Sequence, residues 1–414
     1  MPRFKPFRGI RPAEGLAERI SALPYDVMNR KEAKEMGADP LSFLHISRSE
    51  IDLDDSVDPY SPVVYQTARK NLYDMLDEGS LTQDGAPCFY VYREIMDGRV
   101  QTGLVGCASI DDYASGHIKK HELTRVEKEI DRINHFDACD AHTEPVFLTY
   151  RKSGPVSAVI ERVVREADPV YNFTSGDGIQ HILWVVSDSE NIAALELEFE
   201  KIDAFYIADG HHRSASAVKV GTKRRDAARN LTGEEEFNFF LTVLFPDEDL
   251  AILPYNRVVK DLAGLSADEF LAKVGKWFDI ARADEAYAPR TRHEVGMYLD
   301  GQWYVLSCKA DRADTGDVVA DLDISILQNE LLGPILGIED PRTDKRIDFV
   351  GGIRGLSELE KRANSDMRVA FSMYATTIAE LLSVADAGKI MPPKSTWFEP
   401  KLRSGLFVHS FREE

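Results

Sequence analysis

The sequence predicts a mixed α/β protein with two regions, and three observations support this. Apolar runs rich in aromatic and β-branched residues alternate with helical patterns through the first 260 residues. Asp-Gly pairs at 97–98 and 300–301 each separate two apolar runs, as in β-hairpins. The pattern changes near residue 261, so we expect an N-terminal α/β region, 1–260, and a C-terminal α/β region, 261–414.

The expected elements follow from periodicity and from helix-start signals. The segment "SADEFLAKVGKWF" begins with a Ser/Asp cap and predicts a helix just after residue 265. The other expected helices cover 61–78, 124–136, 153–167, 212–230 and much of 357–386 as one long helix. The expected strands are a hairpin in 87–110, strands at 181–188 and 205–208, two strands in 237–259 around "PDED", and a hairpin around 300–301.

Composition limits the class of protein. Hydrophobic residues make up 43% and charged residues 29%, as in ordinary soluble proteins. The formal net charge of −20 disfavours extended nucleic-acid binding but allows a small anionic ligand in a local basic pocket. We find neither a signal peptide nor an apolar run near the length of a membrane helix, so a cytoplasmic protein is expected. The four scattered cysteines predict reduced, mostly buried thiols.

The stretch "FYIADGHHRSASA" (205–217) is the most informative motif. An apolar strand is followed by Asp209, Gly210, His211, His212 and Arg213, and then by small helix-forming residues. A turn from a strand into a helix presents backbone N–H groups and the positive end of the helix dipole. An arginine there adds a forked donor that suits phosphate or carboxylate. We therefore predict an anion site beside an acid, bordering the main pocket.

A second candidate anion site lies in "GHIKKHELTRVEKEIDRINHFDACDAHTEP" (116–145). Thr124 is followed three residues later by Glu, a capping-box pattern that predicts a helix starting at Thr124, directly after His121 and Glu122. Lys128 and Arg132 lie four residues apart and are expected to share a face of that helix. An ordinary solvated helix with ion pairs is the alternative. If one polyphosphate binds both sites, this helix start faces the same pocket as the 209–213 turn.

The histidines raise the question of a transition metal. Seven of the ten histidines fall between His117 and His212, and His117 and His121 are four residues apart. The segment lacks the second histidine of H-E-x-x-H, so the zinc signal is weak. There is also no P-loop, no G-x-G-x-x-G after a strand and no G-x-S-x-G. Histidines in such numbers also serve as phosphate donors or as satisfied core groups.

A third basic, hydroxyl-rich stretch is "MPPKSTWFEPKLRSGL" (391–406). Lys394, Ser395, Thr396 and Lys401 could form a flap over a ligand and contact its phosphates, with prolines limiting the flexibility of the segment. The alternative is a terminal segment that docks Trp397 and Phe398 into a groove.

Six segments are distributed in order over nearly the whole chain: "LPYDVMN" (23–29), "DPLSFLHI" (39–46), "HELTRVEKEIDR" (121–132), "ADGHHRSASA" (208–217), "ILPYNRVV" (252–259) and "MPPKSTWFEPKLRSGL" (391–406). In that order they resemble the segments of the bacterial domain-of-unknown-function family numbered 1015. The D-G-H-H-R turn is also similar to the nucleotide-binding signature of the ParB/sulfiredoxin fold, which includes archaeal kinases of free serine.

The resemblance implies a ParB/sulfiredoxin-like core at about 100–260 and a kinase that converts free L-serine to O-phosphoserine, using ATP or ADP and Mg²⁺. It places Asp209 near the magnesium ion or the substrate hydroxyl, and Gly210, His211, His212 and Arg213 at the phosphates. Asp209, Glu122 and His211 become the catalytic candidates, and the resemblance leaves room for a homodimer. Thr124, Lys128 and Arg132 are carried over to the phosphate site less directly.

Two other functions fit the same residues. A metal-dependent phosphoesterase or nuclease would use the histidines and acids on a phosphate. A nucleotide-binding regulatory protein would bind the ligand without turnover. Phosphoserine, free phosphate, or binding without product would distinguish the three functions.

Overall fold

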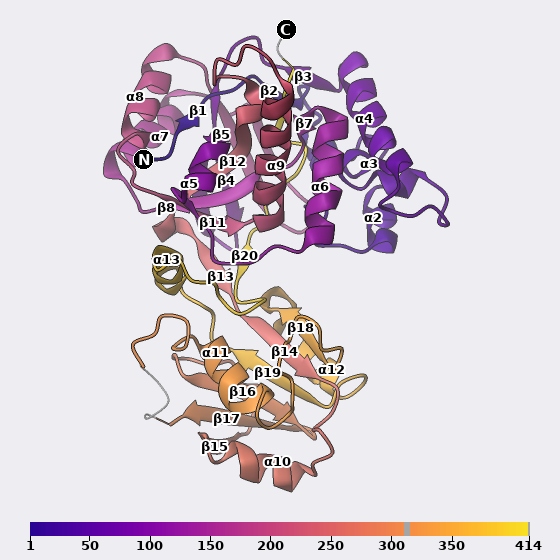
Figure 1. The fold of residues 1–414 in the computed structure, drawn as a ribbon, viewed down its shortest axis with the longest axis vertical. Coiled ribbons are helices and arrows are strands. Elements are labelled where there is room, and N and C mark those ends of the chain that lie inside the picture. The colour runs from indigo at the N-terminus through magenta and orange to yellow at the C-terminus, as the bar shows by residue number, and fades with distance from the viewer. Residues whose placement is uncertain (310–314, 413–414) are drawn as a thin grey trace. The chain divides into compact units, whose positions relative to one another are not determined.

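The computed structural model describes residues 1–309 and 315–412 and divides into two compact units (Figure 1). Unit 1 comprises Met1–Leu250 and Pro400–Glu414, and unit 2 comprises Ala251–Glu399. The change of pattern near residue 261 therefore lies inside unit 2, after two of its strands. Unit 1 is discontinuous because a strand near the C-terminus completes one of its sheets. The architecture is mixed α/β, as the sequence predicts.

Unit 1 is built on a nine-stranded mixed sheet. Its strands follow the order β6-β11-β8-β12-β5-β4-β10-β9, and β1 pairs with β5. The β6/β11 and β8/β12 pairs are parallel, and the other pairs are antiparallel. The strands are β1 (Phe4–Lys5), β4 (Phe89–Met96), β5 (Arg99–Ser109), β6 (Ile118–Lys119), β8 (Val146–Tyr150), β9 (Tyr171–Thr174), β10 (Gln180–Val186), β11 (Phe205–Asp209) and β12 (Phe239–Pro246).

Helices and a smaller sheet complete unit 1. Helix α6 packs beside α9 and α4, and α7 packs beside α8 (Figure 1). The smaller sheet has the order β3-β2-β21-β7, so the C-terminal strand lies between two strands from the first half of the chain. Its strands are β2 (Gly9–Pro12), β3 (Leu81–Gln83), β7 (Ala141–His142) and β21 (Val408–Ser410). The helices are α1 (Ala17–Ile20), α2 (Arg30–Met36), α3 (Leu44–Ser47), α4 (Pro62–Asp77), α5 (Ile110–Ser115), α6 (Val126–Cys139), α7 (Gly154–Glu166), α8 (Ser189–Phe199) and α9 (His211–Ala227).

Unit 2 has its own six-stranded sheet and core. The strand order is β15-β17-β16-β19-β14-β18, with all neighbours antiparallel, and β13 pairs separately with β20. The elements are β13 (Ala251–Leu253), β14 (Tyr255–Val259), α10 (Ala267–Val274), β15 (Phe278–Ala283), β16 (Glu294–Leu299), β17 (Gln302–Cys308), α11 (Asp323–Leu327), β18 (Ile347–Gly351), α12 (Gly355–Ala363), β19 (Val369–Met373), α13 (Ile378–Asp386) and β20 (Trp397–Glu399).

The two hairpins form where local chemistry predicts them. Asp97 and Gly98 have φ values of 51° and 79°, and Asp300 and Gly301 have 51° and 79°. Two consecutive positive φ values are typical of the tight turn that matches the twist of the two strands, and Asp-Gly tolerates them. The predicted capping helix also forms, because Ser266 and the third residue of α10 make a reciprocal capping box.

The prediction of one long helix over much of 357–386 is wrong, because two helices and a strand form there. Helix α12 ends at Ala363, and the backbone N–H of Met367 turns back to the carbonyl of Arg362. The apolar "VAFSM" run then forms β19 between β14 and β16, because pairing inside the sheet buries all five residues. Helix α13 is a new start, capped by Thr377 and Glu380.

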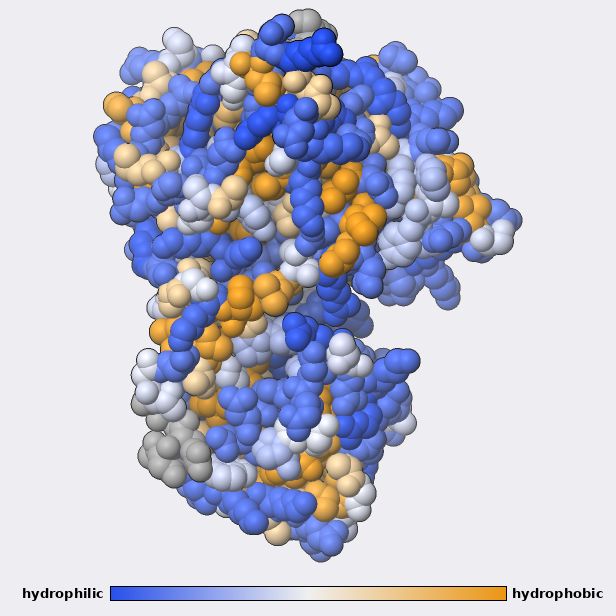
Figure 2. All heavy atoms as spheres, in the orientation of Figure 1, coloured by the Kyte–Doolittle hydropathy of each residue, from blue (hydrophilic) through white to orange (hydrophobic). Residues whose placement is uncertain are grey.

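Hydrophilic residues cover most of the visible surface of each unit (Figure 2). Cys88, Cys107 and Cys139 are buried free thiols, and Cys308 is partly buried, as expected. Among the described residues, no helix has both the length and the apolar character of a membrane span.

Buried histidines are expected to make unit 1 less stable in acid, and His135 allows a single-residue test. Burial, followed by the nearby charge of Arg132, holds the pKa of His135 well below its usual range. The unfolded chain therefore binds a proton that the folded chain does not, so this contribution to stability is complete above about pH 6.5 and declines below it. Between about pH 7.5 and pH 5.5 the wild-type unfolding free energy should fall by ~1 kcal/mol more than that of His135→Gln.

Urea unfolding followed by circular dichroism measures this difference. The control is His117→Gln, which changes an exposed histidine and should leave the wild-type pH dependence intact. Equal pH dependence in His135→Gln and the wild type would contradict the prediction.

Candidate functional site

The 209–213 turn joins β11 to α9, as the sequence predicts. Strand β11 ends at Asp209, Gly210 has a φ of 91°, and α9 begins at His211 with no side chain capping it. The glycine is needed for that φ and for space, since a Cβ there would lie 3.1 Å from Nε of Arg213. The turn therefore brings an acid, the start of a 17-residue helix and a folded-back arginine together.

Asp209 is held as a carboxylate by a residue from the far end of the sequence. Lys401 Nζ lies 3.0 Å from Oδ2, and the backbone N–H of Gly210 donates to Oδ1 at 2.8 Å. Burial alone would raise the pKa of Asp209, but the charges of Lys401 and Arg213 outweigh it and hold that pKa well below its usual range. With 32% of its side chain exposed, Asp209 remains accessible to a ligand.

Arg213 acts as an internal counter-ion in this structure. It is buried, and Nη1 donates to the carbonyl of Pro145 at 2.6 Å, whereas Nε has no hydrogen-bond partner. Burial lowers the pKa of Arg213, but the charges of Asp26, Asp209 and Glu144 reverse this effect and raise it. A direct contact of Arg213 with phosphate therefore stays a prediction.

The helix predicted to start at Thr124 starts later. Helix α6 begins at Val126, and its N-cap residue, Arg125, makes no side-chain capping bond. The Thr124 hydroxyl instead donates to the carboxylate of Glu129, which Lys219 of α9 also contacts. The capping-box prediction failed because Glu129, fixed by Lys219 from another helix, is the acceptor that the threonine meets.

The starts of α6 and α9 nevertheless lie side by side. The backbone N–H of Arg125 donates to Nε2 of His212 at 3.0 Å, and the Ser216 hydroxyl donates to the carbonyl of Glu129 at 3.1 Å. The two candidate anion sites are therefore neighbours, as one shared ligand would require. Whether they border the main pocket stays a prediction.

Lys128 and Arg132 have different surroundings, so the anion site predicted for the pair stays a prediction. Lys128 Nζ lies 3.3 Å from the Tyr60 hydroxyl on an outer part of the unit. Arg132 is buried, with Nη2 2.9 Å from a carboxylate oxygen of Asp131 and its guanidinium 3.9 Å from the centre of the Tyr25 ring. The helical spacing puts both residues on one side of α6, but Arg132 is buried and Lys128 is not.

Glu144 and Ser404 are central residues that the sequence reasoning missed. The Glu144 carboxylate is buried and accepts from the backbone N–H of Tyr25 at 3.1 Å and from the Ser404 hydroxyl at 2.8 Å, with Arg132 at 3.5 Å. Glu144 lies in "HTEP" and Ser404 in "KLRSGL", but no sequence pattern around either residue predicts a role for it. Through Glu144, segments around residues 25, 132, 144 and 404 meet in unit 1.

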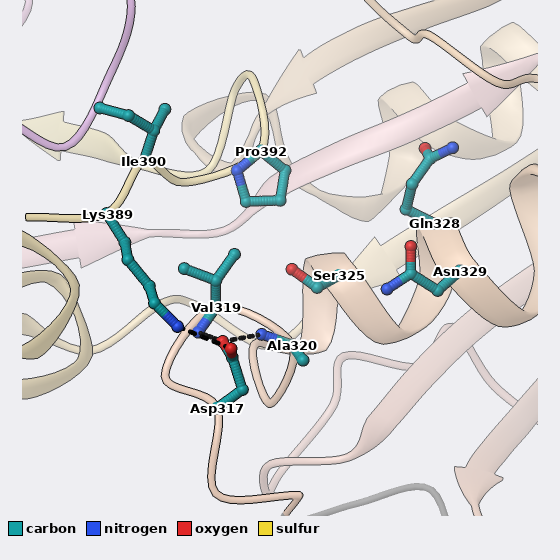
Figure 3. A pocket seen from close by; sticks show the side chains of 9 residues that line it. All are labelled: Asp317, Val319, Ala320, Ser325, Gln328, Asn329, Lys389, Ile390 and Pro392. Atoms are coloured by element: carbon teal, nitrogen blue, oxygen red, sulfur yellow. Dashed lines mark hydrogen bonds and ion pairs between the residues drawn. The ribbon is translucent and has the colours of Figure 1, made fainter. Parts of the chain in front are cut away.

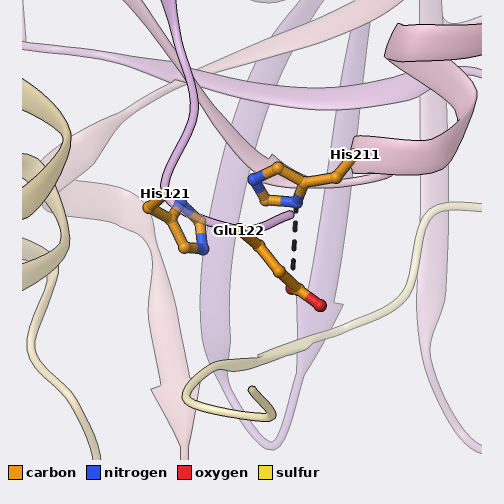
Figure 4. Close-up of side chains that lie close together, drawn as sticks. All are labelled: His121, Glu122 and His211. Atoms are coloured by element: carbon orange, nitrogen blue, oxygen red, sulfur yellow. Dashed lines mark ion pairs between the residues drawn. The ribbon is translucent and has the colours of Figure 1, made fainter. Parts of the chain in front are cut away.

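His121, Glu122 and His211 form a second cluster (Figure 4). Asp209 lies close enough for its charge to act on the pKa values of both rings. Burial lowers the pKa of His121 to about 4, and the charge of Asp209 opposes this shift only in part. Burial, and then the neighbouring His121, lowers the pKa of His211 well below its usual range. Both rings are therefore neutral at pH 7, which suits a hydrogen-bond or ligand role rather than a phosphate counter-charge.

Lys394, Ser395 and Thr396 belong to unit 2. The Ser395 hydroxyl donates to the carbonyl of Pro392 at 2.6 Å, and Arg257 donates to the carbonyl of Lys394 at 2.9 Å, so these contacts hold the segment's own turn. Unit 2 also has a cavity of about 480 Å³, where Lys389 pairs with Asp317 at 2.6 Å (Figure 3). Its lining includes none of the predicted site residues.

Comparisons with solved structures found similar chains at low sequence identity. Among solved structures, a conserved hypothetical protein from Pyrococcus furiosus is 14% identical, with a TM-score of 0.35 over 73% of this chain and 93% of that chain. A free serine kinase in complex with AMP is 13% identical, with a TM-score of 0.36 over 72% and 90%. SbnI with a C-terminal truncation from Staphylococcus aureus is 10% identical, with a TM-score of 0.39 over 74% and 87%.

All three TM-scores lie below 0.5, and a search of curated proteins found no match. The model of the family described as "Protein of unknown function (DUF1015)" matches residues 4–325, which is most of the chain. The chain therefore belongs to the DUF1015 family.

Proposed function

We propose that unit 1 is a nucleotide-dependent kinase that transfers a phosphoryl group to the hydroxyl of free L-serine at the 209–213 turn. One observation carries the proposal: an accessible, ionised Asp209 stands at the start of a long helix with Lys401 3.0 Å away. An anion-binding helix start, a cation and a carboxylate are the parts that phosphoryl transfer needs, since the protein mainly aligns the reactants and neutralises charge.

The roles follow from this geometry. The first turn of α9 and Lys401 bind the phosphates, and Asp209 orients the attacking hydroxyl. A carboxylate with so low a pKa is a weak base, which suffices because the transition state of phosphoryl transfer is loose. Arg213 keeps Asp209 ionised from the buried side. Glu122, 37% exposed at its side chain, is the second carboxylate available for the hydroxyl.

Magnesium fits the acids of this site and not its histidines. Mg²⁺ takes oxygen ligands, and one or two carboxylates plus substrate phosphates suffice to hold it. Asp209 is the residue that would hold it, with the nucleotide supplying the remaining charge. The ion would neutralise the phosphates during transfer.

A metal-dependent phosphoesterase is the second candidate function. The cluster of His121, Glu122 and His211 favours it, because two imidazoles and a carboxylate are the donor set of many hydrolytic metal centres. Hydrolysis and transfer to serine differ in the acceptor, which makes them separable in one assay.

The deciding experiment incubates the full-length chain with Mg²⁺ and either ATP or ADP, with L-serine, L-threonine or L-homoserine as acceptor. L-Alanine, which lacks the hydroxyl, is the control. Phosphorus NMR and mass spectrometry identify the products. O-Phosphoserine formed only with serine supports the proposal. Free phosphate that appears equally with alanine supports the phosphoesterase, and nucleotide binding without any product supports a regulatory protein.

A further inference from the structure

Three metal-binding side chains meet in unit 1 although the sequence pattern lacks a zinc signature. His121 and Glu122 lie between β6 and α6, and His211 is the first residue of α9. One potential ligand atom from each lies within 4.8 Å of the others, and Figure 4 shows the three side chains gathered around one region. The two rings are nearly perpendicular, with their centroids 4.5 Å apart.

Three of the four histidine nitrogens in this cluster lack a hydrogen-bond partner, and the fourth, Nδ1 of His211, lies 4.0 Å from the Glu122 carboxylate. Neither ring nitrogen of His121 makes a hydrogen bond of normal geometry, and neither does Nε2 of His211, although these atoms are buried. His181, another buried histidine of unit 1, shows the usual arrangement, with Tyr92 at Nδ1 and Ser175 at Nε2. Buried polar atoms normally have partners, so the orphaned nitrogens point to a ligand that is not part of the chain.

We propose that His121, Glu122 and His211 bind one divalent transition-metal ion of the zinc type. Neutral imidazole nitrogen suits zinc, cobalt and nickel, whereas magnesium prefers oxygen ligands alone. Two ligand atoms on one tetrahedral zinc ion lie roughly 3.4 Å apart, so the cluster needs a closure of at most about 1.4 Å. Glu122 can supply it, because its side chain is partly exposed while both histidines are buried.

The surroundings favour a cation with open coordination positions. Asp209 lies close enough to both rings to raise their pKa values against the effect of burial, so it adds negative charge beside the ion. Three protein ligands leave at least one position for water or a phosphate oxygen. The metal site rests on the donor geometry and on the unpartnered buried nitrogens, and it stands whether or not the turn is a kinase centre.

Cobalt binding tests the proposal directly. The full-length chain, stripped with a chelator and dialysed, is titrated with Co²⁺ while visible absorption is recorded. We expect d–d bands that saturate at one ion per chain, disappear on adding Zn²⁺, and persist in excess Mg²⁺. Absence of the bands, or their loss in Mg²⁺, would overturn the proposal. No nucleotide or serine is present, so the result is independent of the kinase assay.

Variants locate the site. Glu122→Gln and His211→Gln should each weaken Co²⁺ binding by about a hundredfold, since each removes one of three ligands. His117→Gln is the matched control, because this exposed histidine lies just before β6, four residues ahead of His121, and its replacement should change affinity by less than about twofold. If His211→Gln unfolds, Glu122→Gln still decides, because its partly exposed side chain tolerates the change. Wild-type affinity in Glu122→Gln would exclude the site.

Discussion

Asp209→Asn is expected to lower phosphoserine formation by about a thousandfold, while nucleotide affinity falls by less than about tenfold. The amide keeps the size of the side chain and can still accept the Gly210 N–H, but it removes the charge that pairs with Lys401 and orients the hydroxyl. In the variant the start of α9 still binds the phosphates, and Lys401, released from its ion pair with residue 209, can also contact them. Steady-state kinetics with serine and calorimetric titration of the nucleotide measure the two effects.

The control for this prediction is Asp203→Asn. Asp203 is an exposed acid just before β11, so its replacement tests for a general effect of removing a negative charge near this strand. Its turnover should match the wild type, and thermal denaturation should show both variants folded. Near-normal turnover in Asp209→Asn would remove this turn from catalysis and make Glu122 the carboxylate to test.

Arg132→Ala is expected to lower the unfolding free energy by about 3–5 kcal/mol. Asp131 and Glu144 would keep their buried carboxylates without the guanidinium that lies 2.9 Å and 3.5 Å from them. Stacking on the Tyr25 ring would also be lost. Urea unfolding followed by circular dichroism measures the change.

Lys128→Ala is the matched control for Arg132→Ala, one helical turn earlier on α6. Its ammonium contacts the hydroxyl and the ring of Tyr60, and no buried charge loses its partner when it is removed, so the cost should stay below ~0.5 kcal/mol. A loss of nucleotide affinity in Arg132→Ala with unchanged stability would instead support the sequence-based prediction that Arg132 binds phosphate.

Several features could be predicted from sequence because they depend on neighbours in the chain. The Asp-Gly hairpins and the turn at Gly210 need positive φ values, which only a few residues adopt readily. The helix predicted over 357–386 does not form as one helix, because the structure of this segment depends on residues far away in the sequence. Residues 369–373 form a strand because β14 and β16 lie on either side of them, and sheet pairing overrides a helical pattern.

The sequence by itself determined the mixed α/β class, the strand-to-helix turn and the residue types that gather around it. Only the tertiary structure decided which of them meet. Lys401 reaches Asp209 across 192 positions of sequence, and His211 meets His121 from another segment. It also decided that Arg132 is buried and Lys128 is not. Local preference acts over a few residues, whereas burial and ion pairing depend on which segments the sheet brings together.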